Sequence, residues 1–219
     1  MEEIKKVERL ALENSKIARD EKSRAEETKK LTKQEVKRAK ARETLVKHEI
    51  ELSKIREKLA EESKKLVEKK EKVKDILKFS ESSLKAELDQ ASYNEKVAEI
   101  QKDVAEIQRR IAHAETEIIE VNLKLTNKKI EEAKGRANLA KKQFAYVKLL
   151  RTSASDEKVT KAQESYLKLQ KDLTKFETSA MEINKELVSK QDKLANLKKE
   201  LSEKLAEREK IRPIQSSSS

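Results

Sequence analysis

The sequence predicts an all-α protein, a long antiparallel coiled coil arranged as an elongated three-helix, up-down-up bundle. Charged residues make up 43% of its 219 residues and aromatic residues 3%, a composition typical of long helices. The chain has a single glycine, Gly135, and a single proline, Pro213, so few positions are suited to turns. Its apolar residues recur at heptad spacing, which favours packed helices over a disordered chain.

Residues 1–79 are predicted to form one long helix with a weak heptad seam. Residues 1–80 hold 25 basic and 18 acidic residues, so 7 of the 11 net positive charges lie there. Large apolar residues recur at sevens along it, and small ones such as Ala60 follow them and widen the stripe. We expect this seam to pack on the second helix in a register that places Leu52 against Ile111. Paired residue numbers then sum to 163. The leucines of the seam are Leu45, Leu52, Leu59 and Leu66.

The first candidate break lies between residues 79 and 92, where serines are frequent. Serine competes for backbone hydrogen bonds and favours helix caps, and Ser92-x-x-Glu95 has the form of a capping box. Whether the chain turns here or continues as one helix stays open at this point. If it turns, a second long helix is expected over 84–150.

The second helix has a heptad seam whose phase shifts near residues 123–129. Gly135 follows the shift, and we expect it to be a tolerated surface glycine, with close helix approach as the alternative.

The third helix is predicted over 156–211. Ser155 suits its N-cap, and residues 159–201 hold a heptad in phase for over forty residues. Pro213 stops the helix, and 212–219 form a polar tail that we expect to be disordered.

A short turn at Ser153 favours an antiparallel hairpin of the second and third helices. Folding the chain there places bulky residues of one helix against small ones of the other, as for Tyr166 and Ala140. So slender a rod leaves seams exposed, and we expect dimerisation to cover them. The predicted helix–helix seam comprises Ala133, Ala137, Ala140, Phe144, Ala162, Tyr166, Leu169, Leu173, Phe176, Ile183, Leu187, Leu194, Leu197 and Leu201.

A basic stripe is the strongest local charge signal. Most of its members share one arc of the first helix, which could hold an anionic surface such as a membrane, a filament or nucleic acid. A solvated helix face is the simpler interpretation, and no nearby aromatic residue supports base stacking. The stripe comprises Lys29, Lys30, Lys33, Lys37, Arg38, Lys40 and Arg42.

The two histidines suggest no metal site. In the register summing to 163, His48 faces Glu115, with His113 and Glu117 nearby. We interpret His48 as a seam histidine satisfied by a carboxylate, because the Glu-x-x-His spacing of di-metal bundles is absent. No cofactor is expected.

The sequence contains no motif that indicates catalysis. It contains no cysteine, Gly-rich loop, P-loop, HExxH or Gly-x-Ser-x-Gly motif, so we expect no enzymatic activity. With no signal peptide or transmembrane segment apparent, we expect a cytoplasmic protein, with cytoskeletal association as one option.

The pattern therefore predicts a structural or scaffold protein that mediates protein–protein interaction or self-assembly. Its expected partners are further copies of the chain or other coiled-coil proteins. The three long helices and the basic first helix also make the chain resemble membrane-surface proteins of the BAR type, which is the first alternative. Cytoskeletal or polyanion binding through the basic stripe is the second.

Overall fold

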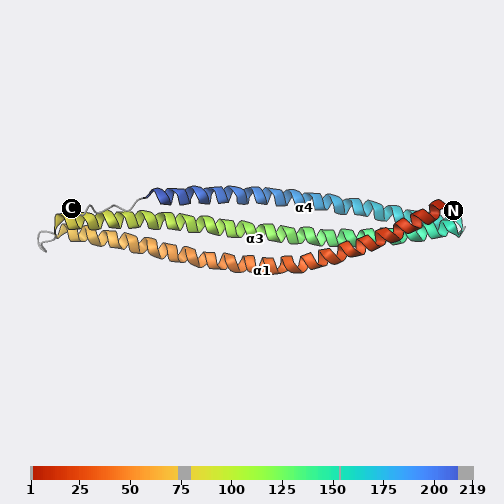
Figure 1. Cartoon of the computed structure of the whole chain (residues 1–219), viewed down its shortest axis with the longest axis horizontal. Coiled ribbons are helices and arrows are strands. Elements are labelled where there is room, and N and C mark those ends of the chain that lie inside the picture. Colours follow the sequence, from red (N-terminus) through yellow and green to blue (C-terminus); the bar gives the residue numbers. More distant parts are fainter. Residues whose placement is uncertain (1, 74–79, 153, 212–219) are drawn as a thin grey trace. The chain divides into compact units, whose positions relative to one another are not determined.

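The computed structural model describes residues 2–73, 80–152 and 154–211. It contains the helices α1 (Glu2–Lys72), α3 (Glu81–Arg151) and α4 (Asp156–Lys210), labelled in Figure 1. These helices account for 97% of the described residues, which include no strand. The predicted all-α fold of three helices is confirmed.

The helix ends differ by a few residues from the predicted ones. α1 ends at Lys72 rather than 79, and α3 begins at Glu81 rather than 84. Residues 74–79, Ser153 and the tail 212–219 lie outside the described residues, so the parts of the predictions that fall there are not addressed. Just before α4, the Ser155 carbonyl accepts hydrogen bonds from the amides of Lys158 and Val159 at 2.9 and 3.2 Å. These bonds start α4 at the position expected for its cap.

The chain divides into two compact units, and a part of each helix belongs to each unit. The first unit comprises Met1–Lys37 and Glu117–Lys190, and the second comprises Arg38–Thr116 and Gln191–Ser219.

In the first unit, α1 and α3 bury small side chains against each other. Ala18 of α1 and Ala140 of α3 are 1% and 4% exposed and line one shallow hollow. The buried residues of α1 follow a heptad at Ala11, Ala18 and Thr32. Those of α3 follow a heptad at Thr126, Ala133, Ala140 and Val147. Small residues on both sides let two helix backbones approach closely.

The second unit repeats this arrangement with another set of residues. Ala60 of α1 and Ala98 of α3 line the same hollow. The buried residues of α1 are Val46, Ser53, Ala60 and Val67, and those of α3 are Ala91, Ala98, Ala105 and Ala112. In both units these two sets pair in an antiparallel register in which residue numbers sum to 158. We call the pairing the small-residue seam.

Ion pairs between α1 and α3 support this register and overturn the predicted one. In the second unit Lys64 Nζ lies 2.7 Å from a Glu95 carboxylate oxygen, which gives a sum of 159 rather than 163. Arg42 Nη1 lies 2.8 Å from a Glu115 oxygen, which gives 157. The predicted register is therefore wrong, because the position after each leucine provides the buried contact. Leu59 lines the edge of this contact, beside Val97 of α3.

The packing of α3 on α4 is more conventional. In the second unit Ile107, Ile111 and Ala114 of α3 form a hydrophobic core with Leu197 of α4, and Leu194 and Leu201 pack against its edge. Large aliphatic residues dominate here, as in an ordinary coiled-coil seam.

In the first unit, Leu173 of α4 packs on Gly135 of α3. A Cβ added to Gly135 would lie 2.8 Å from Leu173 Cδ2. The expectation of a tolerated surface glycine is therefore wrong, and close helix approach is its reason. Ala133, predicted to face Leu173, instead lines a hollow with Ala25 of α1. The register thus differs by two residues at this layer.

Candidate protein-binding surface

α1 carries a heptad row of large apolar side chains that its own unit leaves exposed. In the second unit Leu45, Leu52, Leu59 and Leu66 are 54–64% exposed, whereas Val46 is 8% exposed. Consecutive helix positions point about 100° apart, so a seam centred on the small residues turns each preceding leucine outward. Monomeric proteins rarely expose such a continuous apolar row, and one usually marks an interaction site.

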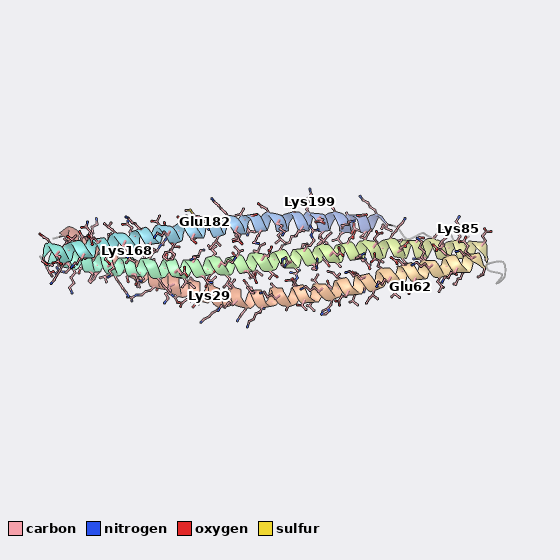
Figure 2. All side chains as sticks on the ribbon, turned by 180° about the vertical axis from the view of Figure 1, so that it is seen from behind. Lys29, Glu62, Lys85, Lys168, Glu182 and Lys199 are labelled. Carbon is pink, nitrogen blue, oxygen red and sulfur yellow. The ribbon has the colours of Figure 1, made fainter. Side chains whose placement is uncertain are left out.

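The spacing of this row is that of a coiled-coil seam. Ile55 lies three residues after Leu52 and is 54% exposed, so large apolar residues occupy both an a and a d position. His48 and Glu62 occupy the neighbouring d positions, and Glu62 is the exposed residue labelled on α1 in Figure 2. We define the leucine stripe as Leu45, Leu52, Ile55, Leu59 and Leu66.

Charged side chains border the leucine stripe on both sides. Glu49 and Arg56 lie on one side, and Glu51 and Lys58 lie on the other, all of them exposed. In a coiled coil these e and g positions select the partner and its orientation. Glu51 also lies 3.4 Å from His48 Nδ1 on the same exposed face.

In the first unit α1 continues the row with Leu10, Ile17 and Leu31, which are 47–62% exposed. Arg24 interrupts it, so this part of the row is less apolar than the leucine stripe.

The residues of the predicted basic stripe differ in their exposure to solvent. Lys29, labelled in Figure 2, is partly buried, and Arg42 is held by Glu115 in the second unit. In the first unit Lys30, Lys33 and Lys37 are exposed and fall at i, i+3 and i+7 on one helix face. Arg38 and Lys40 are exposed as well and belong to the second unit.

The two histidines have other neighbours than the sequence predicted. His113 Nδ1 lies 3.6 Å from a Glu43 oxygen, and His48 is beside Glu51 rather than Glu115. Glu115 lies between Arg42 and Lys198 instead. The expected facing of His48 and Glu115 is thus wrong, because the register of α1 on α3 differs from the predicted one. Among the described residues no group of three or more potential ligands could hold a metal ion.

All of the predicted seam residues are at least partly buried. Fully buried members are Ala133, Ala140, Leu173 and Leu197. The partly buried members are Ala137, Phe144, Ala162, Tyr166, Leu169, Phe176, Ile183, Leu187, Leu194 and Leu201. Ala133 and Ala140 take part in the small-residue seam, because they line hollows together with residues of α1.

A hollow of about 370 Å³ lies between α1 and α3 in the first unit, at the layer of Ala25 and Ala133. Three of its charged lining residues pair with each other, since Arg136 contacts Glu132 and lies 3.8 Å from Glu21. Arg24 and Lys129 line it as well. The small residues of the seam explain the space.

None of the helices, as far as the structure describes the chain, has a stretch long and apolar enough to cross a membrane. Comparisons with protein-family models, with curated proteins and with solved structures find no match for this chain.

The exposure of the leucine stripe is the feature that sequence reasoning missed. A signal for it was present, because α3 carries its own row of alanines at sevens, Ala91, Ala98, Ala105 and Ala112. Two facing rows of small residues allow the two helix backbones to approach closely. Reading the two helices together would have revealed the register.

Proposed function

We propose that the protein is a non-enzymatic helical scaffold that binds other helices through the leucine stripe of α1. The single observation that carries this proposal is the exposure of Leu45, Leu52, Leu59 and Leu66 beside a fully formed small-residue seam. The helix is already packed on its inner side, so the outer stripe is available for a second contact.

The energetics favour a bound partner. Burying a leucine fully contributes about 1.5–3 kcal/mol, so a stripe of four leucines and one isoleucine offers several kcal/mol to a helix that covers it. The flanking charges make the contact selective for partners with matching e and g residues. Self-assembly, other coiled-coil proteins and filament components all fall within this class, and a cytoplasmic or cytoskeletal location is part of the proposal.

A photo-crosslinking amino acid placed at Leu52 tests this function. Its matched control is the same amino acid at Val188 of α4, which is 55% exposed. In a cell extract we expect crosslinks from position 52 to peptides with heptad patterns, from this chain or another protein, and far fewer from position 188. Equal crosslinking from the two positions would contradict the proposal.

Polyanion or membrane-surface binding is the second candidate, and Lys30, Lys33 and Lys37 of the first unit are the observation in its favour. Three lysines on one exposed face attract an anionic surface in a salt-dependent manner. Sedimentation with anionic liposomes, microtubules or DNA tests it at low salt. We expect the triple substitution of these lysines by glutamate to remove binding, and a wild-type chain that stays in the supernatant with all three would exclude it.

A further inference from the structure

We infer that the leucine stripe pairs with the leucine stripe of a second copy, with the two α1 helices running antiparallel. This inference rests on the proposed function and names its partner. The chemistry of the stripe and of its borders selects both the partner and the direction.

In one antiparallel register Leu52 and Ile55 are the residues of the stripe that face each other, and the bordering charges select that register. When residue numbers of the two copies sum to 107, Leu52 faces Ile55 of the second copy and Leu59 faces its His48. Leu66 then faces Ala41, and Leu45 faces Glu62 at the margin of the contact. A two-fold axis crosses the helix between residues 53 and 54. Each contact therefore occurs twice, as required of a symmetric dimer.

The bordering charges agree with the same register. In an antiparallel pair, g positions face g positions and e positions face e positions. At these flanking positions the paired numbers are offset by two from those of the seam. Glu51 then faces Lys58 of the second copy, and Glu49 faces its Arg56, so that two opposite-charge pairs form on each half of the contact. Thr44 faces Lys65 and Arg42 faces Ser63, so no like charges meet at these positions.

A parallel pairing would place each leucine of the stripe against its own copy, but its charges fit less well. It places Glu62 against Glu62 of the second copy and His48 against His48 within the seam. It also places Lys65 beside Lys70, which repel each other. The charges of this helix therefore favour the antiparallel direction, as e and g charges do in coiled coils generally.

The first test measures mass and its dependence on the stripe. We expect light scattering and sedimentation of the full chain to give twice its 25.3 kDa at micromolar concentration. Leu52→Lys should weaken the dimer at least tenfold while helix content stays constant, because Leu52 is already 54% exposed in the single chain. The control Val188→Lys should leave the dimer unchanged. A chain that stays monomeric at all accessible concentrations would overturn the inference.

Charge exchange tests the register. Glu51→Lys and Lys58→Glu should each weaken the dimer several-fold, and the double variant should restore it, because the facing pair is only reversed. In a parallel dimer Glu51 would instead face Arg56 and Lys58 would face Ser63. Failure of the double variant to restore the dimer would therefore overturn the antiparallel register.

Spin labels test the direction, and the absence of native cysteine makes each label unique. The antiparallel register places the labels of Lys54→Cys beside each other and those of Glu68→Cys about 45 Å apart, at about 1.5 Å of rise per residue. Equal short distances at both positions would show a parallel dimer and overturn the inference.

Failure of the inference and failure of the proposed function remain distinguishable. A monomeric chain whose position 52 crosslinks to other proteins would leave the function standing without self-pairing. A monomeric chain with equal crosslinking from positions 52 and 188 would remove both.

Discussion

Leu173 packs so closely on Gly135 that a Cβ added to the glycine would lie 2.8 Å from Leu173 Cδ2. Alanine is favoured over glycine by about 1 kcal/mol inside a helix. The contact opposes that gain, because the buried leucine has to move. The two residues should therefore be energetically coupled.

A double-mutant cycle measures this coupling. Gly135→Ala should stabilise the wild-type chain by clearly less than about 1 kcal/mol, and should approach that full gain in the Leu173→Ala background. Urea unfolding monitored by circular dichroism gives the four free energies. The same gain in both backgrounds would show that the helices do not approach closely here.

Ala18 and Ile17 are adjacent, yet their substitutions should have opposite consequences. Ala18 is 1% exposed within the small-residue seam, so Ala18→Leu should cost about 1–3 kcal/mol of stability through overpacking. Ile17 is 49% exposed, so Ile17→Ala should change stability by about 0.5 kcal/mol or less. Thermal and urea unfolding of the two variants check this. The reverse order of effects would place the leucine and isoleucine row, rather than the alanine row, against α3.

Leu197 should matter much more than Leu205 on the same helix. Leu197 is 4% exposed in the core formed with Ile107 and Ile111, and Leu205 is 39% exposed. Leu197→Ala should therefore lower the free energy of unfolding by about 2–5 kcal/mol, and Leu205→Ala by about 1 kcal/mol or less. Similar losses in the two variants, measured by urea unfolding, would mean that the end of α4 is not packed in this way.

The pair of Lys102 and Glu57 should make stability depend on pH in the alkaline range. The hydrogen bond to Glu57, and then its negative charge, raise the pKa of Lys102 above its usual value of 10.5. The folded chain thus holds this proton more tightly than the unfolded chain. The stabilisation is complete below pH 10.5 and is lost as the pH rises through the raised pKa.

Comparison of the wild type with Lys102→Met isolates this effect. The difference between their urea midpoints should shrink as the pH rises from about 9 through the raised pKa. Lys96→Met, which removes an exposed lysine of the same helix, serves as the matched control. A difference that is constant with pH would exclude a contribution from the Lys102 charge.

Much of this fold could be predicted from residue spacing alone. The scarcity of glycine and proline, the turn near Ser155 and the long heptad of α4 lead to three helices and an antiparallel hairpin. These features are local or involve neighbouring helices joined by a short turn, so the sequence constrains them directly.

The contact face of α1 was harder to predict, because its two candidate stripes differ by one position. The row that includes Leu59 and the row that includes Ala60 both repeat every seven residues. The general rule that large apolar residues lie inside selects the leucine row, which the structure shows to be exposed. The partner row of α3 decides between them, since Ala98 and Ala105 are buried against the small row of α1 and the two helices approach closely. That information lies in pairs of helices rather than in either helix. The interaction surface could therefore not be found without the register.

The small-residue seam also affects which helices of other chains could take the place of α1 against α3. A helix with leucines in place of Ala18 and Ala60 would overpack its contact with α3, whatever its charge pattern. Helices with large residues at these positions are thus disfavoured there by size, whereas the proposed contact at the outer leucines of α1 requires large residues. The two faces of α1 would therefore select helices by opposite criteria, small side chains on the inner face and large ones on the outer face.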